Sequence, residues 1–332
     1  MKGLYLLTCL AITGTACPVL AHHSDAGYDR DRLVTFEGVV SRYIFRNPHI
    51  MIHIETGDGR GGITEWEIET GSTPIMSRSG WSSSMLRPGD VVTVRVHPER
   101  SGANKAILNV LETSDGGSWS QIEVDEEATA TATSISGIWK GIGATTGAFR
   151  SQLNAHALTS AGNAAKEQFS YFEDSLIPDC VPPQAPDAVI GSIVYLNEIE
   201  VMDDQIIIRS EFFDTVRTVY MDGREHPENG ERTNQGHSIG RWEDDVLIID
   251  TTLFSDHPDA NGRGVPAGAS KHLIERVRLS DDRTQLTVDF LLEDPEYLAE
   301  PFAASKALMY TPHLEMITYD CDPVLSRQIG FN

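Results

Sequence analysis

The sequence predicts a mainly β protein with two barrels. A small five-stranded, OB-like barrel is followed by a larger antiparallel barrel of the lipocalin or calycin kind, with one or two short helices. The first observation is that short β-branched and aromatic stretches recur between turn residues. The second is a polar stretch without apolar periodicity, GSWSQIEVDEEATATATS from Gly117 to Ser134, which divides these stretches into two series.

The order of elements in the first series predicts the OB-like barrel. Three strands, a short helix and two further strands follow one another, as in a five-stranded Greek-key barrel. Ser72 and Pro74 mark the helix start. The predicted strands span residues 33–45, 49–56, 64–70, 87–98 and 105–112, and the helix spans residues 72–78.

The second series predicts an up-and-down antiparallel barrel, because its strands follow one another through short hairpin turns. Such a barrel encloses either a packed core or a ligand cavity. One helix is predicted at residues 158–169. The predicted strands span residues 136–142, 192–201, 205–212, 215–222, 237–244, 246–254, 271–280 and 285–293.

The start of the chain predicts export to the periplasm or the medium. Lys2 precedes an apolar run, and Val19 and Ala21 supply the small residues that signal peptidase prefers before a cut. A lipid anchor at Cys17 is disfavoured, because Gly14 stands where a lipoprotein signal usually has leucine. The predicted organisation is a signal at 1–21, an OB-like domain at 22–113, a linker at 114–134 and a barrel domain at 135–332.

Composition limits the classes of partner. The formal charge of −23 becomes −24 when the signal, with its single charged residue Lys2, is removed. Such acidity argues against nucleic acid and anionic membranes as partners. No later stretch reaches the roughly 18–20 apolar residues of a membrane span. The sequence contains no phosphate-binding loop, so no nucleotide cofactor is expected. No feature of the sequence indicates an oligomeric state.

Two cysteines remain after the signal, Cys180 and Cys321. An even pair in an exported chain predicts a disulfide, which typically stabilises a fold by about 2–4 kcal/mol. Two buried free thiols are the alternative.

Histidines predict a metal site in the first domain. Strand alternation after Pro48 places three isoleucines on one face and His49, Met51 and His53 on the other. These borderline and soft donors favour copper over zinc. A cut after Ala21 would add His22, whose α-amine and imidazole can chelate one ion, and His23. The alternative is that these histidines are merely solvated.

Polar residues beside the strands of the second domain predict a site for a small anionic or oxygen-rich ligand. The prediction requires Arg217, His237 and Arg241 to face the barrel lumen together. Either Glu275 or Arg276 would join them, since the two alternate along one strand. The candidate ligand-binding residues are Arg217, Tyr220, Arg224, His226, His237, Arg241, Trp242, Glu275 and Arg276.

A catalytic interpretation of the same residues is open. His237 with Asp222 or Asp250 would form a base and its orienting carboxylate, and Arg241 could stabilise an oxyanion. Without a nucleophile motif, the enzyme class would be an isomerase, lyase or hydratase. The competing interpretation is structural, because turns and cross-strand ion pairs use the same residues. The sequence favours an exported binding protein, with an acid/base enzyme and a structural or interaction module as alternatives.

Several motifs resemble families of exported bacterial domains. AHHSDAGYD, FRNPHIMIHIE, TEWEIETGS and LRPGDVVTV resemble an uncharacterised family over roughly residues 21–113. His22, His23 and His49 fall on that pattern, whereas Met51 and His53 are features of this chain. RTVYMDGREHP, GHSIGRWEDDVLIIDTTLF and YDCDP are similar to a second uncharacterised exported domain. Neither resemblance implies an activity.

Overall fold

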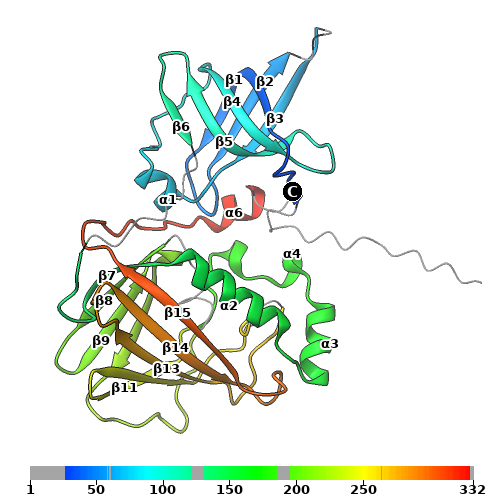
Figure 1. The fold of residues 1–332 in the computed structure, drawn as a ribbon. Coiled ribbons are helices and arrows are strands. Elements are labelled where there is room, and N and C mark those ends of the chain that lie inside the picture. The colour runs from blue at the N-terminus through cyan, green and yellow to red at the C-terminus, as the bar shows by residue number, and fades with distance from the viewer. Residues whose placement is uncertain are drawn as a thin grey trace, which may run out of the picture.

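The computed structural model describes residues 27–329, apart from residues 58, 60, 121–129, 186–194 and 263. Two β domains are joined by a C-terminal segment and helix α6, Pro323–Ile329, which lie between them (Figure 1). The predicted mainly β fold with a small and a larger barrel is confirmed. No helix in the described ranges is long and apolar enough to span a membrane. The predicted signal lies outside the described residues.

The first domain has the predicted element order. The sheet runs β3-β2-β1-β4-β5-β6, and a parallel β3–β5 pairing closes strands β1 to β5 into a barrel. Its core contains Ile50, Ile52 and Ile54, all fully buried, as strand alternation predicted. The elements are β1 Val34–Ile44, β2 Met51–Gly57, β3 Ile63–Glu69, α1 Thr73–Arg78, β4 Val91–Pro98, β5 Lys105–Thr113 and β6 Ser118–Ser120.

The predicted linker, residues 114–134, has two described ends, and each of them packs with the neighbouring domain. Strand β6 pairs antiparallel with β5, and Trp119 packs against the first core. The turn before β6 contains Gly116 in the left-handed region, which glycine adopts without strain. At the other end, Ala132 is buried in the second core. Trp119 and Ala132 stand in polar sequence without apolar periodicity, so the sequence did not indicate that either packs in a core.

The second domain is a closed nine-stranded barrel in the order β10-β11-β12-β13-β14-β15-β7-β8-β9. The prediction of a purely antiparallel barrel is wrong at one pairing, because β10 and β11 are parallel. Strand β15 was not predicted. The strands are β7 Gly137–Gly141, β8 Leu196–Val201, β9 Gln205–Ser210, β10 Thr215–Tyr220, β11 His237–Glu243, β12 Val246–Thr252, β13 His272–Leu279, β14 Gln285–Glu293 and β15 Phe302–Tyr310.

Most helices of the second domain lie between β7 and β8, while the short helix η3, Phe212–Asp214, lies between β9 and β10. Helix α3, Ser160–Gln168, matches the predicted helix and is capped by Thr159, whose hydroxyl accepts a hydrogen bond from Gly162 N at 3.0 Å. Helix α2, Gly143–Ala155, was not predicted and packs against β15 (Figure 1). Phe149 of α2 is fully buried against Phe290 and Phe302. Short helices α4, Tyr171–Asp174, and η2, Ile177–Asp179, follow.

Two apolar clusters fill the barrel interior, with polar residues between them. One cluster surrounds Trp139 and the other surrounds Phe149. On β13, Glu275 is buried between Leu273 of the Phe149 cluster and Val277 of the Trp139 cluster. Its ion pair with Arg217 therefore lies inside the barrel.

A buried carboxylate holds the two domains together. The Glu211 side chain is fully buried and accepts hydrogen bonds from both terminal nitrogens of Arg78 in α1, at 2.7 and 2.9 Å. It also accepts from Leu196 N at 2.9 Å and Ile317 N at 2.8 Å. Three separate parts of the chain therefore meet at one side chain.

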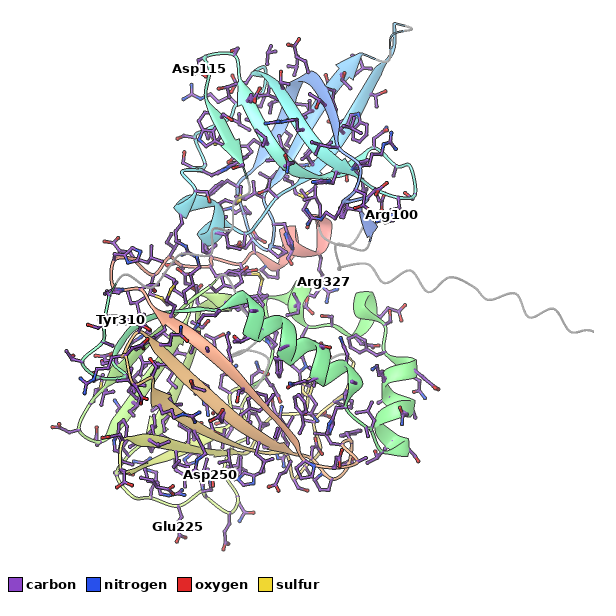
Figure 2. All side chains as sticks on the ribbon, in the orientation of Figure 1. Arg100, Asp115, Glu225, Asp250, Tyr310 and Arg327 are labelled. Carbon is purple, nitrogen blue, oxygen red and sulfur yellow. A yellow bond between two sulfur atoms is a disulfide. The ribbon has the colours of Figure 1, made fainter. Side chains whose placement is uncertain are left out.

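The C-terminal segment makes further contacts with both domains. The predicted disulfide between Cys180 and Cys321 is confirmed. Buried Asn47 of the first domain contacts Thr73 N at 2.9 Å and donates to the Tyr319 carbonyl. In α6, Arg327 donates to Asp179 at 2.5 Å (Figure 2). The segment is thus fixed covalently to one domain and by hydrogen bonds to the other.

We expect Arg78→Met to lower the free energy of unfolding by about 3–5 kcal/mol, because it leaves the buried Glu211 carboxylate without its cation. Arg95→Met is the matched control, since Arg95 and Glu112 form an exposed pair at 3.7 Å. Removing such a pair should change stability by less than about 1 kcal/mol. Differential scanning calorimetry measures both, and equal losses in the two variants would contradict the role given to Glu211.

Candidate functional sites

One face of the first domain combines histidine and carboxylate side chains. On β3, Glu65, Glu67 and Glu69 alternate with core residues and therefore share the outer face. Across from them on β2, Met51 pairs with Glu69 and His53 pairs with Glu67. Glu67 is paired with Lys105 at 3.3 Å, which leaves Glu65 and Glu69 as the carboxylates beside the histidines.

His49 lies next to the start of β2 with a defined orientation. Its Nδ1 is 3.1 Å from the Thr70 carbonyl and 3.1 Å from Glu69 Oε1. Because both neighbours are acceptors, Nδ1 carries a proton, and in the neutral tautomer Nε2 then has the lone pair. The ring is 38% exposed. A carboxylate on one ring nitrogen with the other nitrogen free is the arrangement typical of metal-binding histidines.

The start of the described chain is anchored beside His49. Gly27 O accepts from Arg100 N at 2.9 Å, and Tyr28 forms a bridge with Glu99. The Tyr28 hydroxyl donates to Glu69 Oε2 at 3.2 Å. Burial, followed by the Glu69 charge, raises the pKa of Tyr28, so the hydroxyl stays protonated and able to donate. Tyr28 and His49 therefore share one carboxylate.

The structure does not bring His53 to the same point as His49. The nearest carboxylate to His53 Nδ1 is Glu65, at 3.9 Å, four residues from Glu69 along β3. At the rise of a strand this is a separation of about 13 Å. Met51, which lies between His49 and His53 along the chain, is buried. Within the described ranges, no three His, Cys, Asp or Glu side chains have metal-binding geometry. His22 and His23 lie outside the described residues.

The predicted ligand-binding set of the second domain is divided between the two sides of the barrel wall. Arg217 and Glu275 point into the lumen, where each is 3% exposed. His237 and Arg241 point outward, because Ser238 between them is the buried, inward residue of β11. The predicted common floor of Arg217, His237 and Arg241 is therefore wrong.

Inside the barrel, Arg217 belongs to a compact hydrogen-bonded group. Its Nε donates to Ser238 Oγ at 2.9 Å, and its Nη2 donates to Thr251 Oγ1 at 2.6 Å and to Glu275. Its Nη1 is buried without a partner. The group provides the compensation that a buried charge needs to remain ionised.

Outside the barrel, five side chains form what we call the outer histidine network: His226, His237, Asp250, His272 and Glu293. His226 Nδ1 lies 2.8 Å from His237 Nδ1, and its Nε2 lies 3.1 Å from Asp250 Oδ1. His272 lies 2.8 Å from the same Asp250 oxygen and 3.1 Å from Glu293. In Figure 2, Asp250 lies on the side of the barrel away from the first domain.

Neighbouring groups give the histidines of the network opposite proton affinities. Hydrogen bonding to Asp250 raises the pKa of His272, and Glu293 adds to this effect. The same hydrogen bond from His272 lowers the pKa of Asp250. Burial lowers the pKa of His237, and nearby His226 and Arg224 lower it further. The network therefore combines a His272 that favours its protonated form with a His237 that favours its neutral form.

Several predicted residues gather at this network. The Tyr220 ring stacks on His237 at 5.2 Å, and the Arg224 guanidinium lies 3.8 Å from the Tyr220 ring centroid. Of the two predicted partners for His237, Asp250 is connected through His226, while Asp222 pairs with Arg224 instead.

The remaining candidates of the set lie elsewhere on the barrel surface. Arg241 and Arg276 both pair with Glu243, and Trp242 is exposed. His272 and Glu293 were not predicted as site residues. His272 ↔ Glu293 is a cross-strand pair, and alternation from the apolar core positions of β13 and β14 places both side chains outside.

Comparison with known families gives a similarity for the first domain only. Residues 10–108 match the model of a family of unknown function, DUF6152. The match agrees with the predicted resemblance to an uncharacterised family, and its range includes His22, His23 and His49. No curated protein matches the chain. The resemblance predicted for the second domain stays a prediction.

We expect His272→Gln to destabilise the protein more at about pH 5.5 than at about pH 8.5. A histidine whose pKa is raised above 6.5 in the folded state stabilises fully below the unfolded value, and this contribution is lost as the pH rises through the folded value. Urea denaturation of wild type and variant at both pH values measures the difference. An equal loss at the two pH values would contradict an ion pair of His272 with Asp250 and Glu293.

Proposed function

We propose that the first domain binds a metal ion, copper rather than zinc, through His49 and the amino-terminal histidines His22 and His23 of an exported chain. The observation that carries the proposal is the Glu69 carboxylate, which contacts both His49 and Tyr28. It links the only described histidine of the family-like pattern to the segment that follows His22 and His23.

Chain length supports this proposal. His22 precedes Tyr28 by six residues, which can span at most about 20 Å. The Tyr28 hydroxyl and the His49 ring contact opposite oxygens of one carboxylate, so the segment is long enough for His22 to reach His49. Export with cleavage after Ala21 is part of the proposal, because only then does His22 carry a free amine.

The donor set fits the metal. The free His49 Nε2, a terminal amine and one or two further imidazoles are borderline nitrogen ligands, which suit copper and zinc and not calcium or magnesium. Glu69 would hold the His49 ring in position and would place a negative charge beside the bound ion. Met51 and His53 are not needed.

The test is calorimetric titration of the mature protein with Cu(II) and Zn(II), with tighter binding expected for Cu(II). We expect His49→Ala, or one residue added before His22, to weaken binding at least about tenfold, because each removes a ligand or alters the chelate. His53→Ala is the matched control and should bind as wild type does. Unchanged affinity in both the His49→Ala and extended proteins would overturn the proposal.

A second candidate function is acid/base chemistry at the outer histidine network. It is supported by the series His237, His226 and Asp250, in which a carboxylate orients one histidine and that histidine contacts a second. If His226 Nε2 donates to Asp250, His226 Nδ1 accepts from His237 Nδ1, and His237 Nε2 is left as a base. The lowered pKa of His237 keeps that base neutral near neutral pH.

Hydrolysis of p-nitrophenyl acetate, a general probe of reactive imidazoles, tests this candidate. We expect wild type to exceed the His237→Gln variant, because the variant removes the base. His97→Gln in the first domain, where His97 Nδ1 contacts the Arg32 carbonyl, is the matched control and should retain the rate. A His237→Gln rate equal to that of wild type would exclude His237 as the base.

A further inference from the structure

A cleft of about 720 Å³ lies between the first domain and the C-terminal segment. Its walls come from the end of β1, from α1 and from residues 317–320. Its size is within the range of small-molecule sites, which occur preferentially at domain interfaces. None of the predicted ligand-binding residues lines this cleft, and no sequence pattern predicted it.

Two arginines, Arg42 and Arg46, line the cleft. Arg46 forms an ion pair with Asp320 at 2.9 Å, which neutralises its charge. Arg42 is exposed, and no acceptor among the described residues contacts its guanidinium. The cleft therefore presents one uncompensated positive charge on a chain whose formal charge is −23. An arginine without a protein partner can take a carboxylate through two parallel hydrogen bonds.

Apolar and aromatic side chains lie beside Arg42. Ile44, Phe45 and Ile317 line the cleft together with the Tyr43 ring. The Tyr43 hydroxyl donates to the Ser82 carbonyl at 3.0 Å, which fixes this ring 6.1 Å from Phe45. The cleft is therefore lined by apolar residues and by Arg42.

We propose that this cleft binds a small organic anion with one carboxylate-like group at Arg42 and an apolar body against Phe45 and Ile317. The negative charge of the chain opposes the approach of multiply charged anions and leaves singly charged ones favoured. This site is independent of the proposed metal site, because it uses neither His49 nor the amino-terminal histidines.

Contacts of the C-terminal segment with the second domain hold the cleft open. Ile317 N is bound to Glu211, and Tyr319 N donates to Asp214 Oδ1 at 2.8 Å. Cys321 is joined to Cys180 by the disulfide. The wall formed by the C-terminal segment is thus fixed before any ligand arrives, which reduces the entropy lost on binding.

The test uses two fluorescent probes of similar shape, with the mature full-length protein. Anilinonaphthalene sulfonate carries one negative charge, and N-phenyl-1-naphthylamine carries none. We expect the sulfonate to bind one site, and Arg42→Gln to weaken its binding about 10–100-fold, since a charge-assisted hydrogen bond is lost. Binding of the neutral probe should not respond to this variant.

Two further variants make the result decisive. Arg95→Gln, which changes an exposed arginine on β4, should bind the sulfonate as wild type does. Thr318→Trp should abolish binding of both probes, because exposed Thr318 lines the cleft and a larger side chain fills it. Equal affinities in the Arg42→Gln and Arg95→Gln proteins, or probe binding that survives Thr318→Trp, would overturn the proposal.

Discussion

The buried carboxylate of Glu211 is the interaction on which the arrangement of this protein depends. An ionised carboxylate removed from water costs several kcal/mol unless hydrogen bonds and a cation compensate it. Here the compensation comes from Arg78 of the first domain, Leu196 of the barrel and Ile317 of the C-terminal segment. Because no two of these donors belong to the same part of the chain, Glu211 is satisfied only when all three are in place.

The C-terminal segment, which Glu211 holds through Ile317 N, also connects the two proposed sites of the first domain. The RNPH sequence, residues 46–49, lies between β1 and β2, with one residue separating it from the end of β1. Arg46 pairs with Asp320 at the cleft, Asn47 bonds to Thr73 and Tyr319, and His49 contacts Glu69 on the outer face. Contact with the C-terminal segment therefore fixes the backbone that also orients the His49 ring, although the two proposed sites share no residue.

Much of the fold could be predicted from the alternation of apolar and polar residues along the strands. The sites could not, because they depend on which polar face points inward and on contacts between distant parts of the chain. Strands such as β2 have one apolar face, so their burial was predictable. Strand β15 was missed because its inward side includes Ala304 and the buried Lys306. On β11 both faces are polar, with His237 and Arg241 on one and Ser238 on the other, and hydrophobicity could not decide which points inward. His226 lies in a loop, and its contact with Asp250 forms only when the barrel folds, so strand alternation could not predict this contact.

The buried polar group decides what the barrel displays outside. A shift of one residue along a strand exchanges its two faces, so moving β10 or β13 alone would bury Glu275 or Arg217 without its partner. The free-energy cost of burying an unpaired charge therefore favours the register in which Arg217 contacts Ser238 and Thr251. In that register, His237 and Asp250, the neighbours of Ser238 and Thr251 in sequence, must both point outward, where His226 connects them. The outer histidine network is thus a consequence of the ion pair inside the barrel.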